Sequence, residues 1–135
     1  MRQGSKLTEA ELQSLGTRTF AAGYDATFAA AREALTALGY QLELASAAQG
    51  RITTARRQTA ASANTRFGSA TVSAVYRQYD LQVVRVDPGH TRVVARPRIY
   101  EDKRDVSHQA VWKLSGQDGE HERWRALFAQ IELGL

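Results

Sequence analysis

Residues 24–44, YDATFAAAREALTALGYQLEL, contain the change of hydrophobic period that decides the fold. In the first part of this stretch the apolar residues recur every three or four positions, which draws one stripe along a helix. The members of the stripe are Tyr24, Phe28, Ala31, Leu35 and Leu38. After Gly39 the period becomes two, which is typical of a half-buried strand. The apolar residues expected on one face of that strand are Tyr40, Leu42 and Leu44.

The two ends of the predicted helix, from about Asp25 to Leu38, carry residues of the types that cap helices. Asp25 is expected to be the N-cap, because a short carboxylate there accepts hydrogen bonds from the first free backbone amides. Gly39 is expected just past the end in a left-handed conformation, which glycine adopts without strain. Tyr40 then folds back onto Leu35, as in a Schellman motif.

Two strands are expected on either side of a turn at residues 87–90. Their inward apolar residues are odd-numbered in both strands, so odd residues should lie opposite odd residues. In the register that we expect, Tyr79 lies near Ile99. The same register places Asp80 near Arg98, which is a favourable pair of charges across the strands.

The remaining segments differ in the structure that they predict. Residues 51–57 are expected to form a strand, and the small polar residues 58–70 a long loop or a frayed hairpin tip. Pro97 cannot donate a ladder hydrogen bond, so its strand should be an edge there, or bulged. A final helix is expected to begin near Asp118, as its N-cap, after an irregular charged segment. Its apolar stripe consists of Trp124, Leu127, Phe128 and Ile131.

These elements predict one α+β domain at residues 17–135, preceded by a flexible leader at residues 1–16. With a short first strand at residues 17–20, the expected order is β-α-β-β-β-β-α. Two amphipathic helices and alternating strands predict a two-layer sandwich. Its antiparallel sheet has four to five strands, and both helices cover one face. The expected core residues are Phe28, Leu35, Leu38, Leu81, Val83, Trp124, Leu127 and Phe128.

The composition limits the functions that are open to the chain. It has 135 residues, of which 43% are hydrophobic, and this suffices for one packed domain. The absence of cysteine excludes disulfides, thiolate metal sites and a cysteine nucleophile. The net charge is +4, and 15 of the 18 basic residues are arginine. This balance permits an anionic partner without requiring one.

The ionisable residues form no pattern of an active site. The three histidines, at positions 90, 108 and 121, lack the spacing of metal ligands. Asp105, Ser107 and His108 are residue types of a nucleophilic triad, but sequence neighbours rarely assemble one, and no nucleophile elbow surrounds the serine. We therefore predict no catalytic residues, no metal and no cofactor, and expect that the protein is not an enzyme.

One face of the expected sheet carries long polar side chains together with tyrosines. The residues of this possible partner-binding face are Tyr76, Gln78, Gln82, Arg92, Arg96, Arg98 and Tyr100. Arginines interleaved with tyrosines on an open sheet can bind phosphates and stack bases. The glycine-aromatic run of RNA-recognition sheets is absent, however, and Asp80 would neutralise Arg98. A protein partner is therefore the leading hypothesis, and nucleic acid is the alternative.

From Phe20 to Thr53 the chain shows a longer pattern: an aromatic-led helix ends in Leu-Gly-Tyr, and the next strand runs to a small turn and Gly-x-Ile. The residues of this pattern are Tyr24, Phe28, Leu35, Leu38, Gly39, Tyr40, Gly50 and Ile52. Together with the closing helix at residues 124–135, WRALFAQIELGL, it resembles small bacterial envelope lipoprotein domains of the BamC-like kind. The resemblance implies a helix-grip-like fold and an exported, often lipid-anchored assembly module without an active site.

The leading hypothesis is thus a non-enzymatic interaction or assembly domain of the bacterial cell envelope, the soluble part of a lipoprotein. It would be periplasmic or anchored to the outer membrane, with another envelope protein as partner and membrane contact only through a lipid anchor outside this chain. Residues 1–16 lack the apolar segment of a signal peptide. Export therefore depends on a leader and a lipidated cysteine ahead of residue 1.

Two further hypotheses remain. If translation starts at Met1, we expect a cytoplasmic domain that binds nucleic acid through the basic sheet face. The third, an enzyme or a small-ligand carrier with a cleft between helix and sheet, rests on fold analogy alone. Such a cleft would be lined by Tyr24, Phe28 and Trp124, which we assign to the core.

Overall fold

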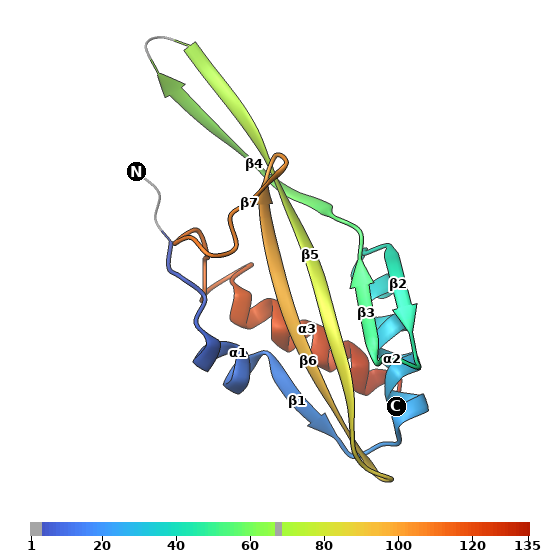
Figure 1. The fold of residues 1–135 in the computed structure, drawn as a ribbon. Helices are drawn as coiled ribbons and strands as arrows, with labels where there is room; N and C mark the ends of the chain where they lie inside the picture. Colours follow the sequence, from blue (N-terminus) through green and yellow to red (C-terminus); the bar gives the residue numbers. More distant parts are fainter. Residues whose placement is uncertain (1–3, 67–68) are drawn as a thin grey trace.

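The computed structural model describes residues 4–66 and 69–135 of the chain (Figure 1). Within these residues the chain is α+β, with one antiparallel sheet of seven strands and three helices. In chain order the elements are α1 (Glu9–Leu15), β1 (Thr17–Phe20), α2 (Tyr24–Ala37), β2 (Leu42–Ser46), β3 (Arg51–Thr54), β4 (Arg57–Arg66), β5 (Ser69–Asp87), β6 (His90–Glu101), β7 (Arg104–Asp105) and α3 (Glu120–Leu133). The class and the antiparallel sheet are confirmed, but the predicted strands and helices were too few.

The N-terminal end of α2 differs slightly from the prediction. The helix begins at Tyr24, and its N-cap is Gly23, whose backbone is extended. The hydroxyl of Thr27 donates a hydrogen bond of 2.8 Å to the Gly23 carbonyl. Asp25 is therefore not the cap. It lies in the first turn, where its negative charge interacts favourably with the positive end of the helix dipole.

The C-terminal end of α2 confirms the Schellman motif. Gly39 has φ of 92°, and the Tyr40 amide donates a hydrogen bond of 3.0 Å to the Leu35 carbonyl. A bulge between Leu42 and Leu44 then interrupts the alternation in β2. Leu42 packs against the core, but Leu44 is 40% exposed. The prediction that Leu44 faces inward is wrong, because the bulge turns it to the other face of the sheet.

Two long strands, β5 and β6, form the centre of the sheet. The strand order is β1-β6-β5-β3-β2, while β4 pairs with β5 beyond β3 and β7 pairs with the end of β6. On the side of β6 away from β5, pairing with β1 ends at Val94 and pairing with β7 begins at Tyr100. Pro97 therefore lies at an edge of the ladder in the described part of the chain, as predicted.

The predicted register between β5 and β6 is correct in parity but wrong in position. Odd residues lie opposite odd residues, yet Tyr79 is opposite Pro97 and Asp80 is opposite Arg96, two residues from the prediction. The cause lies near the turn, where Asp87 pairs with His90 and a bulge follows before the regular ladder. The tight turn and the bulge together decide which residues meet further along the strands.

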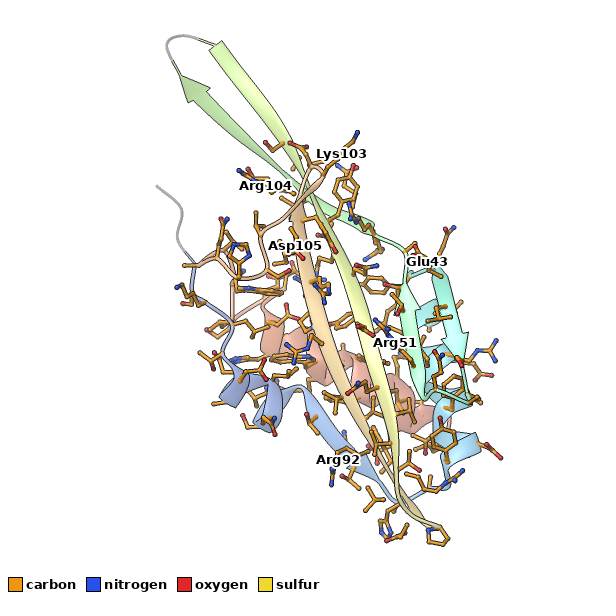
Figure 2. All side chains as sticks on the ribbon, viewed as in Figure 1. Glu43, Arg51, Arg92, Lys103, Arg104 and Asp105 are labelled. Carbon is orange, nitrogen blue, oxygen red and sulfur yellow. The ribbon has the colours of Figure 1, made fainter. Side chains whose placement is uncertain are left out.

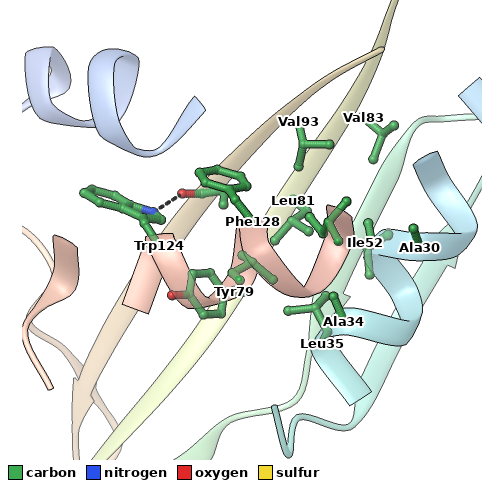
Figure 3. Packing of buried hydrophobic residues seen from close by; sticks show 14 of the residues in the cluster. Ala30, Ala34, Leu35, Ile52, Tyr79, Leu81, Val83, Val93, Trp124 and Phe128 are labelled. Atoms are coloured by element: carbon green, nitrogen blue, oxygen red, sulfur yellow. Dashed lines mark hydrogen bonds between the residues drawn. The ribbon is translucent and has the colours of Figure 1, made fainter. Parts of the chain in front are cut away.

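The helices α2 and α3 contribute to one buried cluster together with the odd-numbered residues of β5 and β6 (Figure 3). Seven of the eight predicted core residues are buried in this cluster, and Leu38 packs against it partly buried. Trp124 is among them, and its indole Nε1 donates a hydrogen bond of 2.9 Å to the Ala95 carbonyl of β6 (dashed in Figure 3). This bond joins α3 to the sheet. Phe28 and Trp124 are buried and Tyr24 is half-buried against them, so the three belong to the core.

The first sixteen residues contain more structure than a flexible leader. The helix α1 begins with a capping box, in which the Thr8 hydroxyl accepts a hydrogen bond from the Glu11 amide and the Glu11 carboxylate accepts one from the Thr8 amide. Leu12 is buried in the main core, and Leu7 packs against it. Two leucines are too few to reveal an apolar period, which is why the sequence does not predict this helix. The first three residues lie outside the described part of the chain.

Most of residues 58–70, predicted as a loop or a frayed tip, belong to strands. The strand β4 pairs with the first part of β5 from Arg57 opposite Arg77 to Arg66 opposite Ser69. The resulting hairpin projects from the rest of the sheet (Figure 1). The loop prediction is wrong because the ladder is made by the backbone, and this segment has no proline to interrupt it. Residues 67 and 68 lie outside the described residues.

The segment between β6 and α3, expected to be irregular, forms a small second core. Trp112 is buried there with Val106 and Ile99, and its indole donates a hydrogen bond of 2.8 Å to the Ser107 carbonyl. The helix α3 begins at Glu120, later than predicted, and its N-cap is Gly119. The predicted cap, Asp118, instead has φ of 62° in the preceding turn.

Candidate functional site

The predicted partner-binding residues lie on the face of the sheet opposite the core helices, which we call the open face. Each is an even-numbered residue of β5 or β6, whereas odd-numbered residues of these strands form the core. The seven residues are Tyr76, Gln78, Gln82, Arg92, Arg96, Arg98 and Tyr100. The ladders with β3 and β2 add Leu44, Arg51 and Thr53 to the same face. Figure 2 labels Arg51 and Arg92 on it.

Three arginines of the open face pair with carboxylates of the same chain. Arg51 donates two hydrogen bonds to Asp80, at 3.1 and 3.0 Å. This corrects the predicted pairing of Asp80 with Arg98, because β3 places Arg51 opposite Gln82, diagonal to Asp80 on the same face of the sheet. The other two pairs join Arg96 to Glu9 of α1, at 3.0 Å, and Arg98 to Asp105 of β7, at 3.2 Å. Much of the positive charge is therefore neutralised within the protein.

The carboxylate of Asp105 is held ionised by its surroundings. Its partial burial would raise the pKa, but hydrogen bonds from Ser107 and the charge of Arg98 outweigh that effect and lower the pKa below the usual value. The Ser107 amide donates one of these bonds, at 2.9 Å. Asp105 therefore stays ionised beside Arg98 at neutral pH.

The two tyrosines of the open face differ in how much of their surface is accessible. Tyr76 is half-buried, whereas Tyr100 is only 8% exposed. The guanidinium of Arg56 lies 3.7 Å from the centroid of the Tyr100 ring. Its hydroxyl donates a hydrogen bond of 3.1 Å to the Gln78 side chain, which in turn donates one of 2.7 Å to the Thr54 carbonyl. One face of the Tyr100 ring is therefore already occupied by a cation, which leaves little of this ring for stacking on a base.

The other part of the open face combines exposed apolar side chains with an arginine that has no ion pair among the described residues. Val84 is 43% exposed and lies opposite that arginine, Arg92. Leu44 is 40% exposed at the β2 edge, and Val94 of β6, two residues from Arg92, is half-buried. This region has the mixture of apolar and arginine side chains that protein interfaces contain.

Sequence reasoning missed four of the residues that shape this face. Val84 is even-numbered in a strand whose odd residues form the core, so its exposure follows from the alternation once the strand is known. Leu44 is exposed only because of the β2 bulge, for which the sequence has no mark. Arg51 and Arg56 come from a segment whose place beside β5 depends on the strand order.

The residue types of a nucleophilic triad do not come together as one. The Ser107 hydroxyl accepts a hydrogen bond of 3.0 Å from the Ile99 amide, and so holds the loop after β7 against β6. His108 is exposed. Over residues 4–66 and 69–135, His, Asp and Glu side chains form no cluster of three that could hold a metal ion. None of the helices in this part of the chain has the length and apolar character needed to cross a membrane.

Comparison with protein-family models finds none that matches this chain, and comparison with curated proteins finds no significant match. The resemblance to BamC-like domains therefore stays a hypothesis, which rests on the residues of the helix and strands between Phe20 and Thr53.

Proposed function

We propose that this protein is a non-enzymatic interaction domain that binds another protein through its open face. The observation that carries the proposal is the pairing of Arg51, Arg96 and Arg98 with carboxylates of the same chain. A face of paired charges around exposed apolar side chains suits a protein surface better than a polyanion. Desolvating an arginine that already has its partner costs less than desolvating a lone cation.

The site of contact that we propose is centred on Val84 and Arg92, with Leu44 toward the β2 edge. Arginine is enriched in protein interfaces, and an apolar group beside it supplies the area that is removed from water. Scattered single apolar residues are normal on protein surfaces, so the grouping of these residues on one face is what supports the proposal.

The cellular setting that we propose follows the resemblance to BamC-like domains. In it the chain is the soluble part of a bacterial envelope lipoprotein, and the partner is another envelope protein. The packing of α2 and α3 against a single face of the sheet is compatible with the helix-grip-like two-layer sandwich of that family. Fractionation of cells that express the gene from its own start tests this setting, and recovery of the protein in the cytoplasm alone would contradict it.

The alternative function is binding of nucleic acid. Tyr76 of β5 and Arg92, Arg96 and Arg98 of β6 would then carry it. Each phosphate contact releases counterions, so binding by these arginines would fall steeply with salt. We expect oligonucleotides to bind only weakly at about 0.15 M salt, in the range of non-specific contacts. An affinity tighter than about 1 µM under these conditions, lost in Arg96→Ala, would overturn the proposal in favour of the alternative.

The direct test of the proposed interface is site-specific photocrosslinking in cells of the source organism. A photoreactive amino acid in place of Val84 samples the open face, and the same residue in place of Ala129, an exposed position of α3, is the matched control. We expect a discrete protein adduct from position 84 that is weakened by Arg92→Glu, and none from position 129. Equal products at both positions, or a nuclease-sensitive product at position 84, would contradict the proposed interface.

A further inference from the structure

A pocket of 620 Å³ opens on the helix side of the sheet, away from the open face. It lies where the end of α2, the beginning of α3 and the strands β4 and β5 meet. Its volume falls within the range of about 300–1,000 Å³ that small-molecule sites occupy. The side chains that matter for its chemistry are Leu38, Tyr40, Arg57, Tyr79, Arg123 and Ala126.

The pocket exists because β5 changes its neighbour at this point. The strand β3 pairs with β5 from Asp80 onward, and β4 pairs with it only up to Arg77. Between the two ladders, the Tyr79 amide donates its hydrogen bond to the Thr54 hydroxyl instead of to a backbone carbonyl. Tyr40, which folds back after the end of α2, forms one wall, and its ring packs edge-on against that of Tyr79 at 5.3 Å between centroids.

The pocket borders a group of buried polar atoms that lack partners. Tyr79 is only 2% exposed, and its hydroxyl makes no hydrogen bond in the structure. Near it lies the ion pair of Arg77 and Glu120, whose side chains are 7% and 1% exposed. Arg77 Nε and Glu120 Oε1 also lack partners. These three atoms are closed off from solvent, and neither Arg77 nor Glu120 lines the pocket, so they form a polar layer beneath the Tyr79 side chain.

Tyr79 stays a hydrogen-bond donor across the physiological pH range. Its burial raises the pKa of the phenol far above the usual value, and the negative charge of Glu120 adds to this rise. The Arg77 guanidinium, which lies beside the hydroxyl, opposes the rise. The hydroxyl therefore stays protonated beside the ion pair.

The mouth of the pocket is positively charged. Arg57 lies over the Tyr40 ring, at 5.5 Å from its centroid, and Arg123 donates a hydrogen bond of 3.2 Å to the Asp118 carbonyl. In the described part of the chain neither arginine has a carboxylate partner. Of the two acids that line the pocket, Glu122 pairs with Arg125 at 2.5 Å, which leaves the carboxylate of Asp118 to offset the two guanidinium groups. An anion is therefore favoured at this opening.

We propose that this pocket binds a small amphiphilic anion, an organic acid with a flat apolar body. The body packs between Leu38, Tyr40 and Ala126, and the acid group meets Arg57 and Arg123 at the mouth. This site is separate from the open face and goes beyond the proposed interaction with a protein, so either can fail without the other.

The test uses 8-anilinonaphthalene-1-sulfonate, a flat aromatic anion, and N-phenyl-1-naphthylamine, which has the same rings without the charge. Binding is followed by fluorescence for the whole protein and its variants. Ala126→Trp fills the pocket from an exposed position of α3, and Ala129→Trp is the matched control outside the pocket. We expect saturable binding of the anion that is at least about tenfold weaker in Ala126→Trp and unchanged in Ala129→Trp. Equal affinity in the two variants would overturn the proposal.

Two more variants test the charge and the hydroxyl. Arg123→Gln should lower the affinity for the anion severalfold and leave the affinity for the neutral probe unchanged. This variant tests the proposal even if Ala126→Trp does not fold. Tyr79→Phe removes the unpaired hydroxyl, so it should not lower the denaturation midpoint. A neutral probe that binds as tightly as the anion, or Arg123→Gln without effect, would overturn the assignment to an anion.

Discussion

The buried pair of Arg77 and Glu120 gives the sharpest prediction about stability. It joins β5 to the first turn of α3, and Arg77 also lies 5.7 Å from the centroid of the Trp112 ring. Replacing Arg77 with Met keeps most of the side-chain volume but leaves the Glu120 carboxylate buried without its counter-charge. Breaking a buried pair in this way costs about 3–5 kcal/mol of folding free energy. Glu120→Leu alone should cost about as much, because it leaves a buried guanidinium.

The double variant Arg77→Met with Glu120→Leu should recover most of that loss. Replacing a buried ion pair with apolar side chains of similar volume is often neutral or stabilising, since both desolvation penalties disappear. Urea titrations followed by the fluorescence of the two tryptophans measure all four free energies of unfolding. Single variants that each cost less than about 1 kcal/mol, or a double variant whose loss is the sum of the two, would refute the reasoning.

Three other predictions follow from particular contacts. Leu35→Ala should cost about 2–5 kcal/mol, because Leu35 is fully buried between α2 and the sheet, and a denaturant titration that shows a loss below about 0.5 kcal/mol would contradict its place in the core. Gly50→Ala should cost more than about 1 kcal/mol, because Gly50 has φ of 66° and a Cβ there would lie 2.4 Å from the Val83 carbonyl oxygen; a thermal midpoint equal to that of the wild type would show that the turn can relax. Asp105→Asn should lower stability at neutral pH. Because the pKa of Asp105 is lowered in the folded state, the stabilisation is present above the ordinary value of 3.8 and is lost as pH falls through the lowered value. The difference between variant and wild type in pH-dependent unfolding should therefore shrink in acid, and a difference that grows toward acid would contradict the sign.

The sequence predicts those parts of the fold that interactions between neighbouring residues decide. Residues 35–40 contain both the end of the α2 stripe and the glycine that stops it, so the Schellman motif could be predicted in detail. The parity of β5 and β6 could also be predicted, because alternation in each strand shows which side chains face the core. The two-residue error in register arose near the turn, where a bulge precedes Asp87 and no residue type marks it.

The candidate site could be predicted only where it depends on a single strand. The alternation placed the seven side chains on one face, but it did not show which carboxylates would neutralise them. Asp80 and Arg51 are 29 residues apart, and Arg96 and Glu9 are 87 apart. Such pairs depend on the order of strands in the sheet, which hydrophobic periodicity does not specify.

The long hairpin of β5 and β6 also has a consequence for the order in which the chain folds. Its strands have 19 and 12 residues and are joined by the short turn at Pro88 and Gly89, so the loop that must close before they pair is small. The contact between α2 and α3, in contrast, joins segments on opposite sides of this hairpin in the sequence. Closing so long a loop is entropically unfavourable until a sheet is present to hold both helices. We therefore expect the hairpin amides near the turn to gain protection from hydrogen exchange early in refolding, and those of α3 to follow once the hairpin offers a surface for docking.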